Sequence, residues 1–175
     1  PYNAAASNMF VLEYVHRPKT ANDFFEDVLM AAVFYGFPLL IENAKYSIAH
    51  YFNNRGYGNY LMSRPYKSFN PSTKPSASER AKKGLPVSGE TIRQLDMLLE
   101  AYVENHVGYN EEGDIGNLLF NETLKQLKEY DPNDRTKSDA VVSAGHALYA
   151  TEVDIRKQED SHSGSSKPLF RKFKV

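Results

Sequence analysis

The clearest helical pattern in the chain runs from Ala21 to Tyr35. A variant of the capping box, in which Thr20 is followed three residues later by Asp23, stands at its start, and Gly36 stands directly after its end. The apolar residues within it recur at helical spacing and share one face: Phe24, Val28, Leu29, Ala32 and Val33. The pattern therefore predicts an amphipathic helix over residues 21–35.

Two short apolar runs flank this helix, at residues 9–15 and 37–43. The second run reads Phe-Pro-Leu-Leu-Ile-Glu-Asn and is apolar enough for a strand buried on both faces. Strand, helix and strand in this order predict a βαβ unit with two parallel neighbouring strands. Glu42 would then stand at the carboxyl edge of a sheet, where α/β proteins place ligands, although a solvated residue just after a strand is the alternative.

Further elements follow the same alternation. We expect a short strand at residues 59–62 and helices at residues 44–53, 89–105 and 115–130, with Ser88 capping the helix at residues 89–105. Ser138 and Asp139 open a last helix rich in small residues, over about 139–148. The sequence as a whole predicts an α/β protein.

Residues 63–89 break the periodic pattern with Pro, Ser, Lys and Arg. Tyr66 and Phe69 lie within this segment, so it could form a protruding hairpin that stacks aromatic rings on bases and places cations on phosphates. A solvated loop is the alternative. The candidate nucleic-acid-binding residues are Arg64, Lys67, Lys74, Arg80, Lys82 and Lys83.

Composition narrows the chemistry. The 175 residues suit one domain, predicted at residues 1–155, followed by a basic tail or linker at residues 156–175. With no Cys, the chain has no disulfide and no Cys nucleophile, so carboxylates and His are left for metal or acid–base work. No apolar run approaches the length of a membrane span and no signal-peptide pattern opens the chain, so we expect a cytoplasmic protein. The chain does not begin with Met, which suggests a fragment or a processed product.

Several short motifs occur in an order that resembles the C-terminal nuclease domain of the large terminase subunit of tailed bacteriophages. They are Tyr14 to Thr20, Leu39 to Asn43, Asn53 to Tyr57 with Asn59 to Leu61, Gly84 to Thr91, and Thr136 to Ala140. The likeness covers about residues 9–152. It implies an RNase H-like fold, a mixed sheet flanked by helices.

The resemblance also implies a two-metal endonuclease that cuts concatemeric viral double-stranded DNA. Glu42 matches the acid at the end of a central strand and Asp139 matches the acid on a late helix, with Asp134 as a fallback. Both would act as catalytic metal ligands for two Mg²⁺ or Mn²⁺ ions, which prefer oxygen ligands. The implied partners are DNA, the phage portal protein and the small terminase subunit, in the cytoplasm of a phage-infected or prophage-bearing bacterium and without a membrane.

One part of the family pattern is missing. No Asp occurs before Asp23, so the family's first catalytic Asp is expected upstream of Pro1, and Glu13 is the one acid of the first strand that could replace it. No Gly-rich phosphate loop for an ATPase motor is present. We therefore expect this polypeptide alone to bind metal poorly and to cut DNA weakly or not at all.

Two other functions fit the same motifs. The chain could be an RNase H-like module without catalysis that clamps DNA or docks on the portal, or another RNase H-like enzyme such as a Holliday-junction resolvase or a transposase core. The spacing of His16, His50 and His106 predicts no zinc site, and His146 is read as a packing residue.

Overall fold

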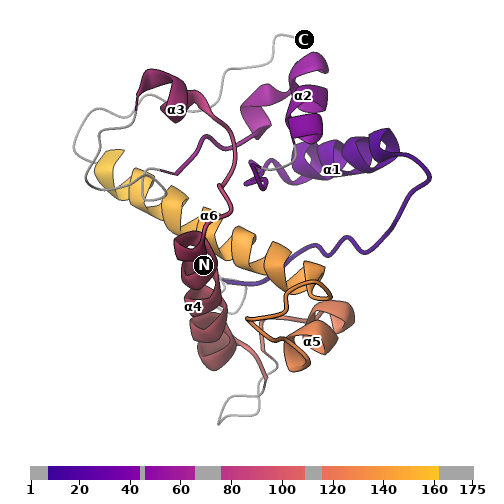
Figure 1. The fold of residues 1–175 in the computed structure, drawn as a ribbon, viewed down its shortest axis with the longest axis vertical. Helices are drawn as coiled ribbons and strands as arrows, with labels where there is room; N and C mark the ends of the chain where they lie inside the picture. Colours follow the sequence, from indigo (N-terminus) through magenta and orange to yellow (C-terminus); the bar gives the residue numbers. More distant parts are fainter. Residues whose placement is uncertain (1–7, 44–45, 66–75, 109–115, 162–175) are drawn as a thin grey trace, which may run out of the picture.

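The computed structural model describes residues 8–43, 46–65, 76–108 and 116–161, without the side chains of Tyr46, Arg80, Ala81 and residues 153–161. Figure 1 shows the long helix α6 with α4 packed against it and α5 beside its N-terminal end, while α1 and α2 pack together elsewhere. The helices are α1 (Ala21–Tyr35), α2 (Tyr46–Asn54), α3 (Ala77–Ala81), α4 (Gly89–His106), α5 (Asn121–Lys128) and α6 (Asp139–Ser161), with a 3₁₀ turn η2 (Gly58–Tyr60).

The helices other than α3 follow the predicted periodicity, whereas α3 lies within residues 63–89, which were predicted as a hairpin or a loop. In α1 the capping box is complete, because Thr20 Oγ1 accepts the Asp23 amide at 3.1 Å and Asp23 Oδ2 accepts the Thr20 amide at 3.3 Å. Gly36 ends it in the left-handed region at φ 70°. α5 is shorter than predicted and α6 is longer, extending into the first residues of the predicted tail. Among the described helices, none has the length and apolar character needed to cross a membrane.

The predicted RNase H-like mixed sheet is wrong, because the described residues form no β-strand. The runs at 37–43 and 59–62 form only isolated bridges, in which Leu39 pairs with Leu61 and Glu42 pairs with Leu85, both parallel. Ser63 and Lys83 form a third, antiparallel bridge. The backbones meet at single residues and separate again, so no ladder develops.

The bridged segments contain residues that interrupt pairing. Pro38 and Pro86 have no amide hydrogen to donate to a ladder. Gly84, two residues before Pro86, adopts a left-handed φ of 77°. The Leu85 amide next to it donates to the Ile41 carbonyl at 2.8 Å. The apolar run at residues 37–43 therefore forms one isolated bridge with each of two neighbouring segments, and not a strand.

Residues 9–15 do not form the predicted first strand either. Their backbones make no hydrogen bond with the backbone of another described residue. The segment is anchored instead by side chains of α4, since the Tyr102 hydroxyl donates to the Asn8 carbonyl at 2.8 Å and its ring packs edge-on against Phe10 at 5.1 Å. The predicted βαβ pairing with residues 37–43 is therefore also wrong, although Phe10, Leu12 and Leu39 line a common cavity of about 340 Å³.

Three groups of buried side chains hold the described elements together. One joins α1 to α2 and the residue after η2: Phe25, Leu29, Ala32, Ile48, Phe52 and Leu61. The other two join α6 to α4 and to the segment before α4: Leu85, Leu95 and Tyr149, and Leu99, Val141 and Ala144. Gly145 permits this close approach, because a Cβ there would stand 3.2 Å from Leu99 Cδ1.

One side of α1 carries apolar side chains that face solvent. Phe34 is 82% exposed, and Met30 and Val33 of the same helix are exposed as well. Val33 was predicted on the inward face, but it lies on the outward side. The amphipathic pattern of α1 is therefore incomplete, which matches its apolar composition on more than one face.

We expect Gly84→Ala to lower the free energy of unfolding by at least about 2 kcal/mol, since the left-handed backbone is strained for alanine. The added Cβ would also stand 2.3 Å from the Ile41 carbonyl oxygen. The matched control is Gly89→Ala, where a Cβ meets nothing within 4 Å and the effect should stay within about 0.5 kcal/mol. Urea unfolding followed by circular dichroism measures both, and equal stabilities of the two variants would contradict the expectation.

Candidate functional site

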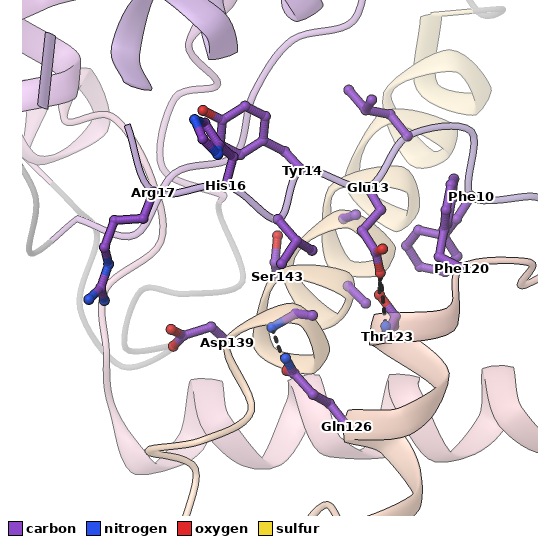
Figure 2. A pocket seen from close by; sticks show the side chains of 15 residues that line it. Phe10, Glu13, Tyr14, His16, Arg17, Phe120, Thr123, Gln126, Asp139 and Ser143 are labelled. Atoms are coloured by element: carbon purple, nitrogen blue, oxygen red, sulfur yellow. Dashed lines mark hydrogen bonds between the residues drawn. The ribbon is translucent and has the colours of Figure 1, made fainter. Parts of the chain in front are cut away.

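A polar cavity of about 420 Å³ lies between the segment before α1 and the N-terminal ends of α5 and α6 (Figure 2). The segment supplies two charged side chains and a histidine, and the two helices supply polar side chains from their first two turns. The polar lining residues are Glu13, Tyr14, His16, Arg17, Thr123, Gln126, Asp139 and Ser143. Residues more than a hundred positions apart in the sequence thus meet in one concave site.

Glu13 caps α5 from outside the helix. Its Oε1 accepts the backbone amide of Thr123 at 2.8 Å and the Thr123 hydroxyl at 2.5 Å. The residue at the N-cap of α5 is Phe120, whose side chain offers no acceptor. A carboxylate beside the first turn of a helix satisfies free amides and is favoured by the helix dipole. Glu13, predicted as a possible metal ligand, therefore has a structural role as a remote cap.

Gln126 caps α6 in the same way. Its Oε1 accepts the backbone amide of Ala140, in the first turn of α6, at 2.9 Å. Its Nε2 donates to Glu122 Oε1, one turn earlier in α5, at 3.2 Å. These two bonds together fix which end of the amide faces α6. α5 thus receives a cap from Glu13 and provides one to α6.

Asp139 is the first residue of α6 and its side chain is exposed to the cavity. In Figure 2 the Glu13 carboxylate turns toward α5, whereas the Asp139 carboxylate turns away from it, on the side where Arg17 lies. Arg17 brings a permanent positive charge to a cavity with two carboxylates. The arrangement offers oxygen atoms to a cation and a guanidinium to an anion in the same space.

Tyr14 lines the same cavity as a neutral phenol. Its hydroxyl donates to Asp27 Oδ2 at 2.7 Å, and this hydrogen bond raises the pKa of Tyr14 to about 12. The phenol therefore stays protonated near neutral pH and cannot act there as a base. Its hydrogen bond to α1 also links the segment that carries Glu13 and Arg17 to the neighbouring helix.

Glu42, the other predicted metal ligand, does not line this cavity. It is half-buried and paired with Leu85 in an isolated bridge, and the Asn43 amide beside it donates to the Leu85 carbonyl at 2.8 Å. The structure therefore does not gather Glu42 and Asp139 in one cavity. Within the described ranges, no group of three or more His, Asp or Glu side chains is placed to hold a metal ion.

The predicted nucleic-acid-binding residues are only partly described. Lys82 is exposed, and Arg64 is half-buried. Lys83 is tied down, because its Nζ donates to the Leu61 carbonyl at 2.9 Å and lies 3.4 Å from Ser63 Oγ. Arg80 belongs to α3, and Lys67 and Lys74 lie outside the described residues. Of the side chains that can be placed, Lys82 is the most open to a phosphate.

The fallback ligand Asp134 is occupied with its own turn. Its Oδ1 accepts the Thr136 hydroxyl at 2.6 Å and the Thr136 amide at 3.3 Å. These bonds to Thr136 hold the pKa of the Asp134 carboxyl below its usual range. Asp139 is therefore the better placed of the two acids near the start of α6.

His146 is bonded within its own helix, where its Nδ1 donates to the Val142 carbonyl at 2.8 Å.

Comparisons with known proteins add no assignment. No protein-family model matches the chain, and neither curated proteins nor solved structures give a match. The resemblance to terminase nucleases thus stays a prediction from the ordered motifs.

The contributions of Thr123 and Gln126 were not foreseen. Glu122 and Gln126 stand one turn apart on a predicted helix, so the sequence indicates a contact between these two side chains. Nothing in that spacing indicates that the amide oxygen would reach a different helix. Arg17 was noted only within the motif from Tyr14 to Thr20, since its cavity forms through contacts distant in sequence.

We expect Glu13→Ala to lower the free energy of unfolding by about 1–2 kcal/mol, because the first turn of α5 loses its only described side-chain acceptor for Thr123. Glu100→Ala, at an exposed position of α4, serves as the control and should change stability by less than about 0.5 kcal/mol. Glu13→Gln keeps an acceptor oxygen and should fall between them. Chemical denaturation measures all three, and a Glu13→Ala variant as stable as Glu100→Ala would contradict the capping role.

Proposed function

We propose that this chain is part of the nuclease of a phage DNA-packaging terminase and contributes to metal-dependent hydrolysis of double-stranded DNA in the cytoplasm of an infected bacterium. The observation that supports it is the placement of Asp139. This acid stands at the first turn of a long helix, is exposed, and shares a cavity with Arg17. Metal-dependent hydrolysis of a phosphodiester uses oxygen ligands to hold the cation, and a guanidinium close by can bind the phosphate.

The donor atoms of the site suit Mg²⁺ or Mn²⁺, but the number of gathered ligands does not suit a complete two-metal centre. Mg²⁺ is usually held by one or two carboxylates, with waters and substrate phosphates completing its shell. Asp139 can supply one carboxylate, whereas Oε1 of Glu13 is already engaged with Thr123. Glu42 lies outside this cavity, so we propose it as a ligand from the sequence motif alone and derive no catalytic step.

Metal binding tests the proposal directly. We expect Mn²⁺ to bind the chain weakly. Asp139→Asn should lower the Mn²⁺ affinity at least about tenfold, since a neutral amide replaces an anionic carboxylate. Glu42→Gln should lower the affinity if the motif assigns it correctly, and Glu100→Gln, an exposed carboxylate on α4, is the matched control. Titration of Mn²⁺ followed by electron paramagnetic resonance measures the free ion.

Two results would count against the nuclease. Mn²⁺ affinity that is the same in Asp139→Asn and in Glu100→Gln would remove Asp139 from any metal site. Cleavage of linear duplex DNA that is slower than cleavage of branched DNA would favour a resolvase over a terminase nuclease.

A second candidate is a DNA-binding or portal-docking module without catalysis. It is favoured by one observation, that the described residues gather no group of three metal-binding side chains while Lys82 is exposed on the basic segment. Such a module would bind DNA without a metal requirement and with a strong dependence on salt. The portal protein and the small terminase subunit remain proposed partners under either candidate.

For DNA binding, we expect Lys82→Ala to reduce the slope of log affinity against log salt by about 1, the loss of one phosphate contact. Lys128→Ala removes another exposed positive charge, at the C-terminal end of α5, and should leave the slope unchanged. Fluorescence anisotropy with a duplex at several salt concentrations measures both. Equal slopes for wild type and Lys82→Ala would exclude this lysine from the contact.

A further inference from the structure

Side-chain hydrogen bonds tie Glu13 to the start of α5 and tie α5 to the start of α6. Glu13 accepts from the amide and the hydroxyl of Thr123, at 2.8 and 2.5 Å. One turn further along α5, Gln126 accepts from the Ala140 amide at 2.9 Å. Ala140 is the neighbour of Asp139, so the last bond of the series acts on the backbone that carries this carboxylate.

We infer that Gln126 is a positioning residue for Asp139, and that Glu13 acts on Asp139 through Gln126. The first amides of a helix have no partner within the helix, so an outside acceptor decides how firmly the first turn is held. At α6 the acceptor described for Ala140 is Gln126, whose amide is itself oriented by Glu122. The inference rests on the proposed function insofar as Asp139 binds a cation.

The surroundings of Gln126 suit this role. Its side chain is half-buried and lines the cavity that Asp139 also lines, so it is held by packing as well as by its two hydrogen bonds. Figure 2 shows its amide between α5 and the backbone of α6. α5 and α6 pack against each other, which keeps the acceptor and the amide in register. Groups that orient a metal ligand in this way typically change metal affinity by tenfold or more when removed.

The chain contains a matched control for Gln126. Gln94 of α4 also donates from Nε2 to a glutamate one turn earlier, Glu90, at 3.1 Å. The corresponding distance from Gln126 to Glu122 is 3.2 Å. Both glutamines are half-buried, but only Gln126 is described as accepting an amide of another helix. Gln94→Met and Gln126→Met therefore remove the same chemistry and differ only in the cap.

The first measurement needs no metal. Amide hydrogen exchange should become about five- to tenfold faster at Ala140 in Gln126→Met, the effect of losing one net hydrogen bond. Glu13→Leu should speed exchange at both Thr123 and Ala140, whereas Glu13→Gln should largely restore it. Gln94→Met should leave Ala140 unchanged. Exchange at Ala140 that is the same in Gln126→Met and Gln94→Met would overturn the inference.

The second measurement reads the effect on Asp139. Mn²⁺ affinity should fall about tenfold in Gln126→Met, and adding Glu13→Leu should lower it little further, because residues acting in series are not additive. Unchanged affinity in Gln126→Met, together with a loss in Asp139→Asn, would overturn the positioning role and leave the proposed function standing. No loss in Asp139→Asn would instead overturn the proposed function, and hydrogen exchange at Ala140 alone would then decide whether Gln126 holds this turn.

Discussion

The packing of α6 against α4 is the interaction on which the candidate site depends. Leu99, Val141 and Ala144 are buried where the two helices meet, and Gly145 lets them come close, since a Cβ there would stand 3.2 Å from Leu99 Cδ1. Because protein interiors are close-packed, such contact limits how the two helices can move relative to each other. Because α5 packs on α6 as well, the polar cavity takes its shape from this helix pair.

The polar contacts of the site also depend on the position of α4. The segment that contains Glu13 is held on α4 by Tyr102, through a hydrogen bond to Asn8 and an edge-on contact with Phe10. Burial raises the pKa of Tyr102 to about 12, so its hydroxyl keeps its proton and remains a donor at any ordinary pH. A hydrophobic contact therefore places the carboxylate that satisfies α5, and α5 in turn places the amide that satisfies α6.

The sequence predicted helices better than it predicted pairing. α1 was recognised from both ends, because Thr20, Asp23 and Gly36 act within one turn of the helix they bound. The run ending in Glu42 was predicted as a strand on its apolar character, but a strand also needs partners, and these depend on distant backbone such as that of Gly84. The site was predicted only in part. Asp139 was proposed because it opens a late helix and matches an acid in the motifs that resemble the terminase nuclease. Gln126 and Arg17 were not predicted, because contacts distant in sequence bring them to the cavity.

The apolar side of α1 has a consequence for how the chain behaves in solution. Phe34 and Met30 leave uncovered hydrocarbon surface, and such surface favours contact with other apolar surface more strongly as sulfate-type salts are added. Attraction between Lys82 and a phosphate weakens under the same conditions, because added ions screen it. Added sulfate should therefore strengthen contacts of this apolar surface while it screens the charge of Lys82, so light scattering is a useful companion to a titration with such a salt.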